Sequence, residues 1–216
     1  MRVSAIRILT PLFALPVAAL ADTGQLTESA YASQSSTMGV VLFDADLGRY
    51  ANCGGYETVQ LRRIAFNRMP LANLQPDAAA DAEITGPTIP TAAPRGFRNF
   101  AFLLPPGQYA MTRMSIRVTR SMTQVGSLEA GPDKLAPGGT PSAGLFRVEA
   151  GEIVYIGNFK IDCDPPMTLW RYFTEGRENF AKQLAEYKQS FPFLKLENVK
   201  YRLFETSTIG RPYELP

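Results

Sequence analysis

The sequence contains no histidine, and this absence narrows the chemistry that the protein can perform. Histidine is the base in Ser–His–Asp and Cys–His catalysis and the commonest protein ligand for zinc and copper. Neither a P-loop nor a G-x-G-x-x-G fingerprint occurs, so there is no recognised cradle for a nucleotide phosphate. We therefore expect a protein that is not an enzyme and that has no cofactor and no bound metal.

Long apolar runs are also lacking, except for a short one within the N-terminal stretch MRVSAIRILTPLFALPVAALAD. There Arg2 and Arg7 precede the apolar core Ile8–Leu20, and Ala19-Leu20-Ala21 forms an A-x-A cleavage site. Two prolines in that core disfavour the alternative, a retained membrane anchor. The pattern predicts that residues 1–21 are a signal peptide and that the protein is periplasmic or secreted. No later stretch approaches the roughly 18 apolar residues of a membrane span, so we expect no transmembrane segment after cleavage.

Net charge of either sign is nearly absent. The chain has 22 lysines and arginines against 20 aspartates and glutamates, and the predicted signal peptide carries two of the arginines and no acid. Cleavage would leave 20 basic and 20 acidic residues. The slight excess of positive charge therefore belongs to a segment that is discarded, and we expect no nucleic-acid partner.

Cysteine is scarce, with only Cys53 and Cys163 in the whole chain. In an oxidising compartment the expected state of such a pair is one disulfide, which would close a loop of about 110 residues. Two free thiols and an intermolecular bridge are the alternatives. The residue that follows the predicted cleavage site is not a cysteine, so no lipid is expected there.

Strand patterns dominate the rest of the chain. Residues 22–36 are small and polar and are predicted to be a flexible lead-in, whereas residues 37–216 are predicted to form a single domain. Apolar or alternating segments predict strands at 37–43, 57–66, 100–104, 109–118, 145–163 and 198–205. Phe180, Leu184 and Tyr187 recur at helical spacing, which predicts a helix near 177–190. The proline-rich insert 67–96 is expected to be either functional or disordered.

Two tight turns predict two β-hairpins. Pro105-Pro106-Gly107 follows the first strand of one pair, and Ala150-Gly151-Glu152 divides the segment 145–163. After the first turn, alternate residues from Ala110 to Val118 are assigned to the core, and those from Tyr109 to Arg117 to solvent. The patterns predict a mainly β fold, an antiparallel β-sandwich of about seven strands with one α-helix in the C-terminal half packed on it.

The turn LPPGQY between two strands, and the later stretch FRVEAGEIVYIGNF, carry a resemblance to known domains. Residues 37–163 resemble the prealbumin-like and carboxypeptidase-regulatory-like β-sandwich domains of small exported bacterial envelope proteins. The resemblance implies a sandwich and no particular activity. The helix and the last strand lie outside the pattern, and the absence of a lipid-bearing cysteine departs from the lipoprotein members.

Four side chains are candidate binding residues. Arg113 and Arg117 are assigned to the solvated face of one strand, where arginines suit phosphate or carboxylate groups, although arginine on such a face is also ordinary. Trp170 and Tyr172 belong to an aromatic cluster that would form either a platform for sugars or a partner, or a contact between a helix and a sheet.

Carboxylates are the remaining candidates for chemistry. Asp44 begins DADLG, which resembles the start of a calcium loop, but the fifth, sixth and twelfth positions hold Gly48, Arg49 and Gly55. We therefore expect a turn there. Asp162 and Asp164 would serve glycoside hydrolysis only if they faced each other across a cleft, and they are expected to end a strand.

Three classes of function follow from these residues. The first is an exported, non-catalytic envelope or secreted protein that acts as an interaction or structural module, with an envelope protein or a glycan as partner. The second is a binding domain that holds a glycan or another small ligand in its long loops. The third is a carboxylate-dependent hydrolase. An exposed apolar patch would favour the first, an aromatic-lined pocket the second, and carboxylates converging in a cleft the third.

Overall fold

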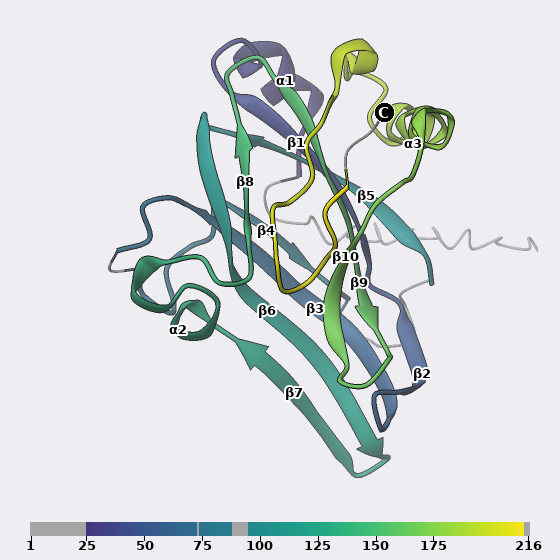
Figure 1. Cartoon of the computed structure of the whole chain (residues 1–216). Coiled ribbons are helices and arrows are strands. Elements are labelled where there is room, and N and C mark those ends of the chain that lie inside the picture. Colours follow the sequence, from purple (N-terminus) through teal and green to yellow (C-terminus); the bar gives the residue numbers. More distant parts are fainter. Residues whose placement is uncertain (1–24, 73, 88–94, 214–216) are drawn as a thin grey trace, which may run out of the picture.

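Two β-sheets pack face to face in the computed structural model, which describes residues 25–72, 74–87 and 95–213 (Figure 1). The fold is therefore a mainly β sandwich, as the sequence predicts. The predicted signal peptide, residues 1–21, lies outside the described residues. Among the described helices, none has the length and apolar character needed to cross a membrane.

The first sheet has the order β10-β9-β1-β5, with β11 also paired to β9. Its strands are β1 (Gly39–Asp46), β5 (Phe97–Leu104), β9 (Ile153–Asp162), β10 (Thr168–Tyr172) and β11 (Lys200–Tyr201). The second sheet has the order β2-β3-β6-β7, with β4 paired to β3 and β8 paired to β6. Its strands are β2 (Arg49–Cys53), β3 (Tyr56–Arg68), β4 (Ala82–Thr85), β6 (Gly107–Ser121), β7 (Gln124–Ala130) and β8 (Leu145–Val148).

The sheets differ from the expected ones in strand number and direction. Eleven strands are present among the described residues, rather than about seven. Several of them are too short to show a clear alternating pattern in the sequence. The first sheet is mixed and not purely antiparallel, since β1 and β11 both pair with β9 in parallel. Parallel neighbours need long connections. The chain leaves β1 and returns in β9 only after it has built the second sheet.

Neither of the two predicted hairpins is a hairpin. The Pro105-Pro106-Gly107 turn connects β5 of the first sheet to β6 of the second, and the turn at Ala150-Gly151-Glu152 connects β8 to β9 in the same way. Both turns are therefore arches between sheets. A short turn between two alternating segments has the same sequence pattern in either case, because each strand turns one apolar face to the core.

A β-bulge in β6 changes which side chains face the core. Phe66 pairs with Met111 and Ala65 with Arg113, so Thr112 is the extra residue. Such an insertion shifts the alternation by one residue. Tyr109 and Met111, expected on the solvated face, are consequently buried in the core between the sheets.

The core between the sheets is rich in phenylalanine. The ring of Phe43 in β1 lies 5.6 Å from that of Phe100 and 5.7 Å from that of Phe102, both in β5. It also contacts Phe66 of the opposite sheet at 5.7 Å. Buried aromatic rings remove large apolar surfaces from water, so the contact between the sheets stabilises the fold.

Helix α3 (Arg177–Ser190) covers the outer face of the first sheet, and its bounds agree with the predicted helix (Figure 1). Phe180 and Tyr187 are buried, and Leu184 is half-buried. All three belong to a second apolar cluster that includes Val40 and Leu42 of β1. The helix is thus packed through its predicted stripe.

Because Leu184 is only half-buried, we expect Leu184→Ala to lower the free energy of unfolding by about 2 kcal/mol, the low end of the range for truncated core leucines. Urea unfolding of the single variant measures this loss. A midpoint identical to that of the parent protein would mean that the helical stripe contributes nothing to stability.

Two segments contain more structure than expected. The lead-in 22–36 includes helix α1 (Glu28–Gln34), whose N-cap Thr27 accepts a hydrogen bond from the Ala30 amide at 3.3 Å. Leu26 is buried beside it and gives the polar segment an apolar anchor. The insert 67–96 includes β4, which adds a strand to β3. The remaining short helices are α2 (Pro132–Leu135), η1 (Pro137–Gly139) and η2 (Leu196–Asn198).

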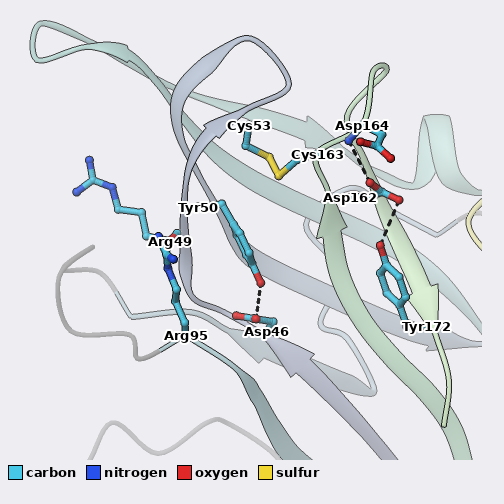
Figure 2. The surroundings of a disulfide bond; sticks show 9 residues. All are labelled: Asp46, Arg49, Tyr50, Cys53, Arg95, Asp162, Cys163, Asp164 and Tyr172. Carbon is cyan, nitrogen blue, oxygen red and sulfur yellow. Dashed lines mark hydrogen bonds between the residues drawn. A yellow bond between two sulfur atoms is a disulfide. The ribbon is translucent and has the colours of Figure 1, made fainter.

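The expected disulfide is present and joins Cys53 to Cys163 (Figure 2). Cys53 ends β2 in the second sheet and is fully buried, whereas Cys163 directly follows β9 in the first sheet. The covalent link therefore connects the two sheets, 110 residues apart in sequence.

Candidate functional site

The four candidate binding residues do not come together, because Arg113 and Arg117 lie in the second sheet and Trp170 and Tyr172 in the first. Arg113 is only 5% exposed, and not solvated as expected. Its Nε donates to the Pro76 carbonyl at 2.9 Å and its Nη2 to the Gln75 carbonyl at 3.2 Å. Arg113 therefore holds the insert against the sheet, and the prediction that its side chain is solvated was wrong.

Arg117 is half-buried on the outer side of β6, where it lines a shallow hollow with Arg62 and Ser127. Burial, and after it the positive charge of Arg117, lower the pKa of Arg62. The two guanidinium groups therefore repel each other. The hollow contains no aromatic side chain and is the weaker candidate for a ligand site.

The side chains of Trp170 and Tyr172 are half-buried on the same side of β10. The Tyr172 hydroxyl donates to Asp162 Oδ2 at 3.1 Å, and Asp162 Oδ1 accepts from the Asp164 amide at 3.0 Å (Figure 2). The two acids thus belong to the turn after β9, as expected. They do not face each other across a cleft.

The DADLG stretch divides between a strand and a turn. Asp46 Oδ1 accepts from the Gly48 amide at 2.8 Å, and its Oδ2 accepts from the Tyr50 hydroxyl (Figure 2). The expected turn is therefore at Asp46. Asp44 instead lies inside β1 and is buried beneath α3, where the Asn99 amide donates to its Oδ1 at 3.2 Å.

The C-terminal segment passes β9 and β10 (Figure 1). A hollow lies beside this segment. The segment pairs with β9 through β11 and returns to β10, where the Arg171 amide donates to the Ile209 carbonyl. The hollow has a volume of about 750 Å³, and we call it the Arg171 cavity. It is lined by Arg171, Phe180, Val199, Lys200, Tyr201, Arg202, Leu203, Phe204, Glu205, Thr206, Pro212 and Tyr213.

The Arg171 side chain lies between two glycines. It is only 2% exposed. Arg171 pairs with Phe159 of β9, which belongs to the core between the sheets. A Cβ atom at Gly157 would lie 2.8 Å from Arg171 Cδ, and one at Gly210 would lie 2.7 Å from its Nε. Any residue other than glycine at position 157 or 210 would therefore force neighbouring atoms to shift. The sequence thus makes room for an arginine where an apolar residue would be expected.

The charge of this arginine is poorly compensated. Its Nη2 donates to the Arg211 carbonyl, and its Cζ lies 5.3 Å from the centre of the Phe173 ring. The Nε is buried and has no hydrogen-bond partner. Within the described part of the chain, no carboxylate forms an ion pair with Arg171. Burial lowers its pKa, which reflects the cost of holding this charge away from water.

Arg113, the other buried arginine, has more structural compensation, although its Nη1 is also buried without a hydrogen-bond partner among the described residues. Besides its two carbonyl acceptors it feels the negative charges of Glu83 and Asp77. The groups that favour the charged form of Arg171 are only Tyr201 and Tyr155. Burial raises the pKa of both tyrosines above the ordinary value of 10, so neither carries a negative charge at neutral pH. Among the described residues, no anion therefore balances the charge of Arg171.

Aromatic rings form much of the cavity wall. The Tyr201 ring lies 5.0 Å from Phe180 and 6.1 Å from Tyr213. The hydroxyl of Tyr201 donates to the Thr174 carbonyl at 3.2 Å, and that of Tyr213 accepts from the Gly176 amide at 3.2 Å. Because these hydroxyls have partners within the protein, both residues offer mainly ring carbon to the cavity.

Sequence reasoning missed this site because it chose the aromatic residues of LWRY rather than the arginine between them. Leu169 and Arg171 share the inward phase of β10, and an arginine in phase with a core leucine was the available signal. Comparison of the chain with protein-family models, curated proteins and solved structures gives no match. The prealbumin-like resemblance stays a prediction, and the function is argued from the site.

Proposed function

We propose that the protein is an exported, non-catalytic β-sandwich that binds a small anionic ligand in the Arg171 cavity. Export is supported by the N-terminal sequence pattern, and the Cys53–Cys163 disulfide is compatible with an oxidising compartment. Among the three classes of function, a binding domain is supported by a large hollow with aromatic walls.

The observation that carries the proposal is that Arg171 is buried and has no carboxylate partner among the described residues. An isolated buried charge costs several kcal/mol, so buried arginines are normally paired. A ligand carboxylate or phosphate would supply the missing partner. A guanidinium stays charged at neutral pH and donates charge-assisted hydrogen bonds to both kinds of group.

A carboxylate-dependent hydrolase receives less support. Glu205 is the one acid among the residues that line the cavity. Asp44 is enclosed beneath α3, and Asp162 is engaged by Tyr172 and by a turn. Two-carboxylate mechanisms need both groups beside the same bond.

An interaction module is the second candidate function, and one observation favours it. Met122, Val125 and Leu128 are 95%, 50% and 39% exposed. Val125 and Leu128 belong to β7, which ends the strand order of the second sheet. An edge strand with exposed apolar side chains can pair with another chain. Association of the purified protein with itself or with an envelope protein, abolished by Val125→Lys, would support this function.

Replacement of Arg171 by methionine tests the proposed function. If Arg171 is retained for a ligand, Arg171→Met removes an uncompensated buried charge, and the free energy of unfolding stays the same or rises by up to about 2 kcal/mol. Urea unfolding of the ligand-free protein measures this change.

The matched control is Arg113→Met, because Arg113 is equally buried but has structural partners. Its loss would leave the Pro76 and Gln75 carbonyls without their donor, so we expect a decrease of about 2 kcal/mol. A decrease of the same size for Arg171→Met would assign Arg171 to structure and would refute the proposed function.

A further inference from the structure

Among the described residues that line the Arg171 cavity, Arg171 is the one buried cation without a carboxylate partner. Arg202 lines the cavity but is held by Glu152, with Nη1 and Nη2 each 2.9 Å from a carboxylate oxygen. Arg211, whose guanidinium also lies over Phe173, pairs with Glu175. Lys200 also lines the cavity, but its side chain is exposed, so water screens its charge. The cavity is therefore suited to a single negative charge.

A doubly charged phosphate fits this arrangement less well. Phosphate sites commonly combine several cationic side chains with backbone amides. Here two of the arginines already have carboxylate partners, and Glu205 adds a negative charge to the lining. A carboxylate carries one negative charge and matches one guanidinium.

The rest of the lining is suited to a ring. Phe180, Tyr201 and Tyr213 present aromatic carbon, and Phe173 stacks behind Tyr213 at 4.6 Å and so supports its ring. Planar aromatic rings and the C–H faces of sugar rings both pack favourably on such surfaces. A volume of about 750 Å³ lies within the range of small-molecule sites.

We propose, building on the function proposed above, that the ligand is a carboxylic acid carried on a ring, with the carboxylate at Arg171 and the ring against Tyr201 and Tyr213. This chemistry has two sources, aromatic acids and acidic sugars. In both, the carboxylate supplies specificity through Arg171, because a neutral analogue would leave the guanidinium without a partner.

The test uses the full mature chain with its disulfide intact and measures binding by isothermal titration calorimetry. The probes are benzoate and D-glucuronate, each with its uncharged counterpart, benzamide and D-glucose, and also acetate and inorganic phosphate. We expect at least one ring acid to bind with a dissociation constant below 1 mM. Its counterpart should bind at least tenfold more weakly, which is the discrimination expected for one charge-assisted contact. Acetate, which lacks the ring, should also bind at least tenfold more weakly.

Two variants locate the binding. Arg171→Met should abolish binding of the ring acid, and Tyr201→Leu should weaken it about tenfold while the weaker binding of acetate stays unchanged. Arg117→Met is the control, because Arg117 lies in the other sheet, and this variant should bind as the parent protein does.

The outcomes separate this inference from the proposed function. If phosphate binds in an Arg171-dependent way and neither ring acid binds, the inference of a ring carboxylic acid is refuted. The proposed function, an anion site at Arg171, is then supported. Equal binding of acids and neutral counterparts, or no binding of either acid at 10 mM, would overturn the inference. Preference for benzoate or for glucuronate would identify the source of the ligand.

Discussion

Replacement of both Cys53 and Cys163 by alanine should lower the free energy of unfolding by about 4 kcal/mol. The link closes a loop of 110 residues, and in the chain-entropy model a loop of that size confines the unfolded chain strongly. It also joins the two sheets of the sandwich (Figure 2). Without the link, the unfolded chain gains conformational freedom, and this favours unfolding. A single domain has only 5–15 kcal/mol of stability in general, so the loss is large.

Guanidinium chloride unfolding at pH 7 measures the change. Cys53 is fully buried, and an alanine there also leaves a small cavity. The matched control is therefore the native sequence reduced with dithiothreitol, which keeps the volume of both side chains. The two losses should agree within about 1 kcal/mol. A reduced protein as stable as the oxidised one would show that the core alone holds the sheets together.

Features with a simple periodicity could be predicted from the sequence. The bounds of α3 were predicted because Phe180, Leu184 and Tyr187 repeat at helical spacing over one buried face. The disulfide was predicted because the chain has only two cysteines. The partners of the strands were not predictable in this way. Alternation specifies which side chains face a core, but it does not say whether the next strand lies in the same sheet or in the opposite one.

The site depended on two features that local patterns do not reveal. The bulge at Thr112 turned Tyr109 and Met111 into the core, and the insert covered Arg113 on the outer face of β6. Most of the residues that line the Arg171 cavity belong to 199–206 and 212–213, which contain only the short strand β11 and follow no period. The phase of Arg171 in β10 is visible in the sequence, but the segment that covers it becomes apparent only in three dimensions.

Asp44 should make the protein less stable as the pH rises from about 4 to about 7. Alternation in β1 places it on the outer face with Val40 and Leu42, and α3 covers that face. Burial raises its pKa from 3.8 to about 7, although hydrogen bonds from Gln183 and other neighbours partly oppose the shift. The nearest acid that contributes is Glu186 of α3, whose negative charge raises the pKa of Asp44 further.

The loss of stability with rising pH follows from the protonation of Asp44 in the folded and the unfolded chain. Below pH 3.8 the Asp44 carboxyl is protonated in both the folded and the unfolded chain, so its full contribution to stability is present. Between pH 3.8 and about 7 the unfolded chain releases this proton while the folded chain keeps it, and stability falls. A shift of this size corresponds to about 4 kcal/mol across the window.

Asp44→Asn should remove this dependence, because asparagine keeps the shape of the side chain and does not ionise. Urea unfolding between pH 4 and pH 8 should show equal stability of the two proteins at pH 4 and an advantage for the variant at pH 8 that approaches 4 kcal/mol. Glu186→Gln is the companion variant, since it removes the neighbouring charge and should move the fall in stability to lower pH. If Asp44→Asn were less stable by the same amount at every pH, Asp44 would contribute through its hydrogen bonds alone, and its proton would have no part in folding.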